Sequence, residues 1–256
     1  MDSIFQLGVP EWKLLSARAH TMIFRFIVGK PRGAVVPVSV GRFTQIDDDG
    51  LMPLFGTSQL RRCPVSSIGN RLIAAHPDWL QWQIIQNANT YEEGFTAAWD
   101  GIRHALWVNR NADTEAPLEG FLQPETVKAI YTSGHPDLSK ISPDNWNTDL
   151  FFLSRPRAHR VQLDLFYDYR TNAALYPTWQ QSLRERQPLT LIFWGQGDIF
   201  FTPAGGEAYL RDLPDAELVR LDSGHFAVED NLQQIADGIT LFYDTRVGPA
   251  VHAVTG

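Results

Sequence analysis

Two residues able to do acid–base chemistry, Asp198 and His225, each follow a short apolar run that leads into a glycine. The first run is Leu189–Trp194 and the second is Leu218–Leu221. Runs of this kind are typical of buried parallel strands, and functional side chains then lie in the loops past the carboxyl ends of the strands. An acid followed by a histidine is the chain order of two members of a nucleophile–histidine–acid triad.

The segment between the two runs predicts how the strands are connected. Residues 201–213 are long enough for one crossover helix, and Pro214-Asp215 is a typical exit from it. Asp198 and His225 are therefore expected at the same edge of a parallel sheet, within hydrogen-bonding reach. His225 would then be the general base, because an imidazole gains and loses a proton near neutral pH. Asp198 would orient the ring and stabilise its imidazolium form.

Other interpretations of these residues stay open. His225 could be a structural loop histidine, and Asp198 could cap the helix that is expected to begin near Pro203. Asp222 is a rival carboxylate. Its position at the end of a strand, three residues before His225, favours a side chain that faces solvent.

No metal or cofactor site is predicted. The other histidines show no ligand-like pairing, and Asp47-Asp48-Asp49-Gly50 lacks the later acidic ligands of a calcium loop, so it is interpreted as a turn. Gly195-Gln196-Gly197 resembles part of a dinucleotide-binding fingerprint but lacks the third glycine. Glu229 and Asp230 are interpreted as acids in the first turn of a helix, where the helix dipole favours them.

The run Trp194-Gly195-Gln196-Gly197-Asp198, taken with Asp222-Ser223-Gly224-His225-Phe226-Ala227, resembles the end of an α/β-hydrolase. The likeness is to the haloalkane dehalogenase and epoxide hydrolase side of that superfamily. It extends back through Gln86–Gly94 to Asn70–Pro77, which resembles the helix after the nucleophile, and covers roughly residues 69 to 245. The resemblance implies an α/β fold with a mostly parallel sheet flanked by helices, and it implies that the acid and the histidine are catalytic.

The spacing of the predicted strands indicates a helical insertion. About 100 residues separate an apolar strand at 82–85 from the strand at 189–194, far more than the usual connection of about 2–6 residues, so the segment must have structure of its own. Hydrolases of the resembled group carry a helical cap at this point. The expected organisation is an α/β-hydrolase core at residues 69–89 and 186–245, a helical cap at 90–185, and a tail at 246–256.

Residues 1–68 match no part of the family pattern, and no nucleophile can be identified there. The family carries Ser or Asp in a Gly-x-nucleophile-x-Gly elbow, which is expected shortly before Gly69. Cys63 lies near that place but has two arginines and a proline as neighbours, and Ser58 lacks the trailing glycine. These features favour an atypical N-terminal segment, rearranged, truncated or frame-shifted, whose strands are incomplete or irregular.

The expected function is hydrolysis of a small apolar substrate, an ester, an epoxide or a haloalkane, through a nucleophile–His225–Asp198 triad. Because the elbow and the oxyanion motif are missing, a catalytically dead hydrolase remnant or a binding module is the alternative. A third hypothesis is a non-hydrolytic use of the same pocket, with His225 as a lone acid–base. Resembled epoxide hydrolases protonate the epoxide oxygen with cap tyrosines, but no flanking motif selects one here.

Composition narrows the class of protein further. A hydrophobic content of 44% and a charged content of 20% allow a substantial core, and a net charge of −7 argues against a nucleic-acid partner. A single cysteine excludes an internal disulfide framework and suits a reducing cytoplasm. No run approaches the ~20 apolar residues of a membrane helix, and a secretory signal is not expected. The predicted location is the cytoplasm, and the oligomeric state is left open.

Overall fold

A computed structural model describes residues 26–29, 35–38, 70–71 and 82–249 of the chain. Its centre is a parallel sheet in the order β3-β4-β5. The strands are β3 (Trp82–Gln86), β4 (Leu189–Gly195) and β5 (Glu217–Leu221). The predicted parallel pairing of the two runs that precede Asp198 and His225 is confirmed, since β4 and β5 are direct neighbours.

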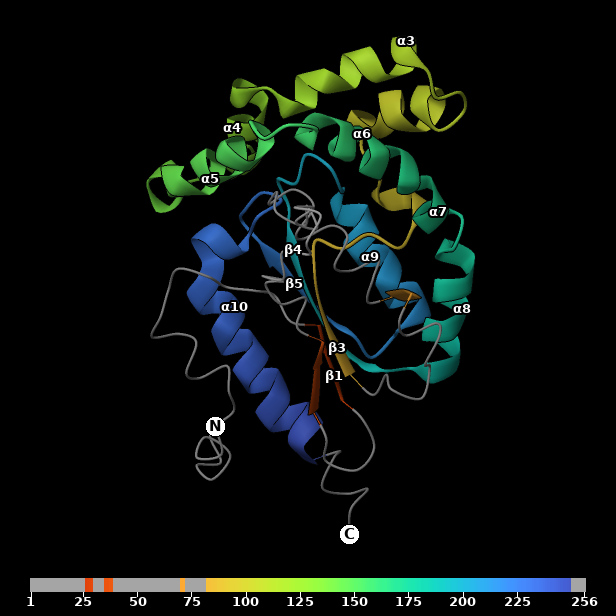
Figure 1. Ribbon diagram of the computed structural model, residues 1–256. Coiled ribbons are helices and arrows are strands. Elements are labelled where there is room, and N and C mark those ends of the chain that lie inside the picture. Colours follow the sequence, from red (N-terminus) through yellow and green to blue (C-terminus); the bar gives the residue numbers. More distant parts are fainter. Residues whose placement is uncertain (1–25, 30–34, 39–69, 72–81, 250–256) are drawn as a thin grey trace.

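An antiparallel pair of strands lies outside this sheet. It consists of β1 (Phe26–Gly29) and β2 (Val35–Val38), and β1 runs beside β3 (Figure 1). Sequence patterns assigned no strand to either segment. The predicted α/β fold, with a parallel sheet and helices around it, is otherwise observed.

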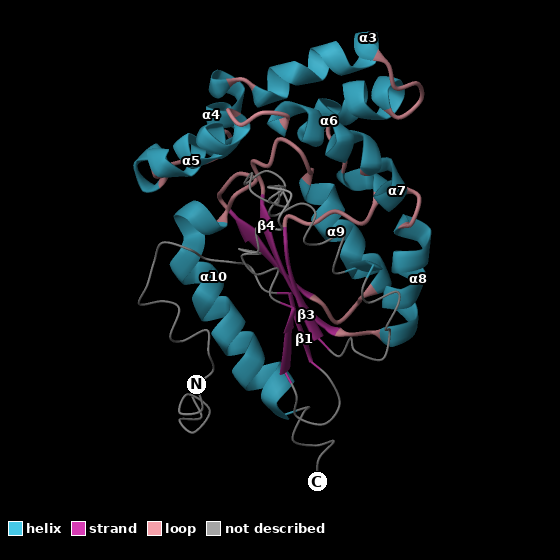
Figure 2. Ribbon diagram, viewed as in Figure 1, coloured by secondary structure: helices cyan, strands magenta, loops and turns pink. Residues whose placement is uncertain are grey.

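Two helices cover opposite faces of the sheet, as Figures 1 and 2 show. These are α9 (Pro203–Asp212), the predicted crossover helix, and α10 (Val228–Phe242), which follows β5. Successive side chains of a strand point to opposite faces. Ile192 and Trp194 of β4 therefore pack with Tyr209 of α9, whereas Leu191 and Phe193 pack with Ile235 of α10. The continuous apolar run of β4 reflects this burial on both faces.

The segment between β3 and β4 is helical and contributes no strand to the sheet within residues 87–188, all of which are described. Figure 1 shows α3 to α6 over the carboxyl end of the sheet, while α8 runs back alongside α9. The predicted helical character of residues 90–185 is confirmed. In chain order, the helices are Glu92–Gly94, Ala97–Trp99, Ile102–Leu106, α3 (Ala112–Glu115), Ala116–Leu122, α4 (Pro124–Thr132), Leu138–Lys140, α5 (Pro143–Leu153), α6 (Ala158–Asp168), α7 (Arg170–Ala173) and α8 (Tyr176–Arg186).

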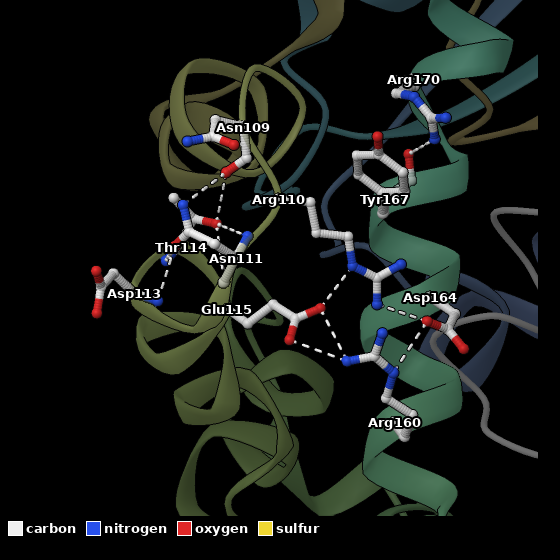
Figure 3. Close-up of polar contacts among 10 residues, drawn as sticks. All are labelled: Asn109, Arg110, Asn111, Asp113, Thr114, Glu115, Arg160, Asp164, Tyr167 and Arg170. Carbon is white, nitrogen blue, oxygen red and sulfur yellow. Dashed lines mark hydrogen bonds and ion pairs between the residues drawn. The ribbon is translucent and has the colours of Figure 1, made fainter.

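A charged network stabilises the outer part of this helical segment (Figure 3). Glu115 accepts hydrogen bonds from Arg110 and Arg160, and both arginines also pair with Asp164 of α6. Asn111 caps α3, because its side-chain oxygen accepts from two backbone N–H groups of the first turn. An isolated surface ion pair contributes little, but charges joined in a network contribute more. The network links the loop before α3 to α6.

Buried tyrosines tie the loop after β3 to α9. Tyr91 donates to Asp212, and Tyr209 donates to the carbonyl of Ala88. Burial raises the pKa of Tyr91, Tyr176 and Tyr209 above the ordinary value, and nearby phenols add to the effect at Tyr91 and Tyr176. A phenol whose pKa is higher in the folded state stabilises the fold below its unfolded pKa and loses that contribution as pH rises.

We therefore expect the free energy of unfolding to decrease as pH rises above about 10, the ordinary value for a phenol. Alkaline unfolding is monitored by circular dichroism. It should coincide with a rise of tyrosinate absorbance from these three side chains at a pH above the ordinary value. Ionisation of all seven tyrosines near the ordinary pH with the fold intact would contradict this expectation.

Candidate functional site

His225 and Asp198 lie side by side at the carboxyl edge of the sheet. The Nδ1 atom of His225 is 2.8 Å from Oδ2 of Asp198, and both side chains are buried. The predicted contact between them is confirmed. Rings of Phe200, Phe201 and Phe226 surround the imidazole, with centroids 5.1, 5.9 and 4.8 Å away. Charge interactions are stronger in such an apolar environment than in water.

The Asp198 carboxylate accepts four hydrogen bonds. Oδ1 accepts from the backbone N–H groups of Phe200 and Phe201, at 2.7 and 3.1 Å. Oδ2 accepts from the Asn87 amide at 2.6 Å and from His225. Four donors match the acceptor capacity of an ionised carboxylate. Asp198 does not cap α9, whose N-cap residue is Thr202, so that alternative is wrong.

Two residues at the end of β3 join the pair to the sheet. Gln86 donates to the backbone carbonyl of His225 at 3.1 Å and to the side chain of Asn87 at 2.7 Å. Asn87 accepts from the backbone N–H of Gly195 at 2.9 Å. Sequence patterns did not identify Asn87 as a site residue. The signal that could have found it is its position in the loop past the carboxyl end of a parallel strand, which it shares with Asp198.

The helical segment meets the loops of Asp198 and His225 through glycines. Gly134, in the turn after α4, has a φ of 77° and lies against Gly197, where an added Cβ would be 2.1 Å from the Gly197 carbonyl oxygen. Gly224 lies against Ser133 in the same way, with an added Cβ 2.2 Å from its carbonyl oxygen. Only glycine allows the backbones to approach this closely. The helical segment is thus fixed directly next to the candidate site.

We expect Gly134→Ala to lower the free energy of unfolding by about 3 kcal/mol, because it adds left-handed strain and a backbone clash. Chemical denaturation monitored by circular dichroism measures this change. Gly120→Ala is the matched control: Gly120 is exposed, and an added Cβ there meets nothing within 4 Å. Equal stability of the two variants would show that the turn can move away from Gly197.

A second buried histidine joins the helical segment to α10. His135 Nδ1 lies 2.8 Å from Asp230 Oδ2, and Ser223 donates to the other oxygen of Asp230 at 2.7 Å. Asp230 was expected only as an acid of the first helical turn, where it does lie, and the sequence showed no ligand-like pairing for His135. The spacing of these residues in the sequence gives no sign of the pair. Asp222 is exposed, as expected.

Several predicted features lie outside the described residues. Cys63 and Ser58, the two nucleophile candidates, are among them, as is Asp47-Asp48-Asp49-Gly50. Within the described ranges, no group of three or more His, Cys, Asp or Glu side chains is arranged to bind a metal ion. No helix in those ranges is long and apolar enough to cross a membrane.

One curated protein is similar to this chain in sequence, whereas no family model matches the sequence. An uncharacterized hydrolase of the yeast Saccharomyces cerevisiae is 32% identical over 177 residues, which make up 68% of this chain and 61% of the yeast protein. The chain therefore spans less than two thirds of the length of that relative.

Solved structures of hydrolases are similar to the described fold. A serine hydrolase from the polyaromatic-hydrocarbon-degrading bacterium Cycloclasticus zankles has a TM-score of 0.51 and 13% identity, with 70% of this chain and 60% of that chain covered. The 2-hydroxy-6-oxo-6-phenylhexa-2,4-dienoate hydrolase of Rhodococcus sp. strain RHA1 has a TM-score of 0.52 and 13% identity, with 70% and 61% covered. The chain has the α/β-hydrolase fold.

Proposed function

We propose that this protein is a hydrolase in which Asp198 and His225 are the acid and the base of a nucleophile–His–acid triad. The observation that carries the proposal is the buried hydrogen bond of 2.8 Å between His225 Nδ1 and Asp198 Oδ2, next to the helical segment. In this arrangement His225 takes a proton from the nucleophile or from water, and Asp198 stabilises the imidazolium that forms. The yeast relative and both solved relatives are described as hydrolases, which supports the reaction class.

We propose that residues 90–185 act as a cap that places a small apolar substrate over the pair. An aromatic cluster joins the cap to the site: Phe201 lies 5.9 Å from the His225 ring and 5.6 Å from Trp99, and Phe95 stacks on Tyr176. Most of these rings pack on one another, as expected for aromatics that join a helical layer to a sheet. A substrate at this place would meet apolar walls.

The substrate class, ester, epoxide or haloalkane, depends on the nucleophile. One feature of the cap bears on the epoxide class. The hydroxyl groups of Tyr169 and Tyr176 are 3.2 Å apart, and burial, followed by the neighbouring Tyr169, raises the pKa of Tyr176. The two hydroxyls are candidates for protonating an epoxide oxygen, a step that esters and haloalkanes do not need.

The alternative function is a binding module that keeps the pair without turnover. The absence of a Gly-x-nucleophile-x-Gly pattern shortly before Gly69 favours it. In that case the Asp198–His225 hydrogen bond would serve stability alone. Ligands of the same three classes would bind without being hydrolysed.

A substrate panel separates these possibilities. The purified 256-residue chain is assayed with a p-nitrophenyl ester, styrene oxide and 1-bromobutane, with product formation measured for each. We expect turnover of at least one class. If the epoxide is turned over, Tyr169→Phe and Tyr176→Phe should lose that activity, whereas turnover of an ester or a haloalkane should not change in these variants. Saturable binding without product in all three assays would support the binding module and contradict the hydrolase.

A further inference from the structure

Asn87 occupies a defined place beside the candidate pair. It follows β3 directly, is buried, and has a left-handed backbone with φ of 44°. Asparagine tolerates this conformation better than most residues, because its short side chain bonds locally. Its backbone N–H donates to the Phe193 carbonyl at 3.2 Å, so the residue stays bound to β4 although β3 has ended.

The contacts of the Asn87 amide fix which of its ends faces the pair. The backbone N–H of Gly195 can only donate, so the atom that meets it at 2.9 Å must be Oδ1. Gln86 also donates to Oδ1. Nδ2 therefore faces the other way, 2.6 Å from Oδ2 of Asp198. This is the same carboxylate oxygen that accepts from His225.

We propose that Asn87 is a positioning residue, whose amide donates to Asp198 Oδ2 and holds that oxygen against Nδ1 of the His225 ring. This inference rests on the proposed function of the pair. Oδ1 of Asp198 is already fixed by two backbone N–H groups, so the Asn87 bond fixes the second oxygen and, with it, the orientation of the carboxylate. The imidazole is then held as the Nδ1–H tautomer, which leaves Nε2 to act as the base.

Other charged groups near His225 are occupied elsewhere or face solvent. On the loop before it, Asp222 is exposed. On α10, Asp230 binds His135 and Ser223, and Glu229 accepts from Asn145 of the helical segment. The carboxylate that faces the ring in the described structure is that of Asp198, so a change in its orientation should be readable at the ring.

Nuclear magnetic resonance of the full 15N-labelled chain tests the proposal without requiring turnover. Long-range proton–nitrogen correlations give the tautomer of His225, which is assigned by the loss of its signals in His225→Gln. Asn87→Gly removes the side chain and suits the left-handed backbone. Asn87→Asp keeps the shape and an acceptor for the Gly195 N–H, but it cannot donate to Asp198 when both facing carboxyls are ionised. Asn89→Ala is the matched control, because Asn89 is buried two residues away and binds the Tyr91 backbone instead.

We expect the wild type and Asn89→Ala to show the Nδ1–H tautomer, with a downfield Hδ1 signal. In Asn87→Gly, that signal should weaken and the Nε2–H tautomer should become populated. In Asn87→Asp, the His225 titration should move to higher pH by about one unit, because a second carboxylate faces the pair. Where turnover is measurable, kcat of Asn87→Gly should fall about 10- to 100-fold with little change in KM.

Wild-type tautomer and titration in both Asn87 variants would overturn the positioning role. A change in Asn87→Gly alone, measured at a pH where both facing carboxyls of Asn87→Asp are ionised, would also overturn it, since the link to Gly195 would then be what matters. The proposed function fails separately, through absence of turnover in the substrate panel, whatever the magnetic resonance result.

Discussion

Replacing His225 with glutamine is expected to lower kcat by about a million-fold, the loss seen when the base of such a triad is removed. Glutamine is similar in length but cannot accept a proton at neutral pH, so neither nucleophile nor water is activated. In the part of the chain that the structure describes, the ring is buried and Phe200 packs against it. Steady-state kinetics on the substrate that is turned over fastest in the panel measure this effect.

The control for that variant is His104→Gln, because His104 is exposed on the helical segment. It should keep wild-type kcat. Circular dichroism should show that both variants are folded. A triad without its base should retain far less than about one hundredth of the wild-type kcat. A higher residual kcat in His225→Gln would show that His225 is not the catalytic base.

Replacing Asp198 with asparagine is expected to lower kcat by about ten thousand-fold. The asparagine keeps the shape of the side chain but carries no charge, so it stabilises the imidazolium poorly and no longer selects the Nδ1–H tautomer. The effect is smaller than that at His225, because the ring itself remains available as a base. Kinetics over a range of pH, with the same substrate, measure the loss.

Asp222→Asn is the matched control for Asp198, since it removes a carboxylate that precedes His225 by three residues and is exposed. It should be without effect on kcat. Comparable losses in Asp198→Asn and Asp222→Asn would mean that the general negative charge near the loop, rather than the hydrogen bond to His225, supports the reaction.

The sequence was informative where a local pattern determines the structure. The apolar run of β4 and the glycine that ends it predicted a buried parallel strand, and the segment that became α9 had the length of one crossover helix. Together they placed Asp198 and His225 at one edge of the sheet, because parallel strands share their carboxyl edge.

Features that depend on contacts between distant residues were not predictable. Asn87 meets Asp198 across 111 positions, and His135 meets Asp230 across 95. No local sequence pattern around Asn87 or His135 indicates which distant residue it contacts. Helix boundaries in the insertion show the same limit: the sequence indicated helical structure over 90–185 but not where each helix ends, as α6 does at Asp168. Beyond α10, helical structure continues from Tyr243 through the buried Val247.

A double-mutant cycle on kcat/KM with wild type, His225→Gln, Asp198→Asn and the double variant tests whether Asp198 and His225 act as one catalytic unit. Residues that act as one unit give strongly non-additive losses. We expect the double variant to be no more than about tenfold slower than His225→Gln alone, since Asp198 acts through the ring. If the loss of kcat/KM in the double variant equals the product of the two single losses, or if the wild-type chain shows no turnover, the two residues do not act as a catalytic unit.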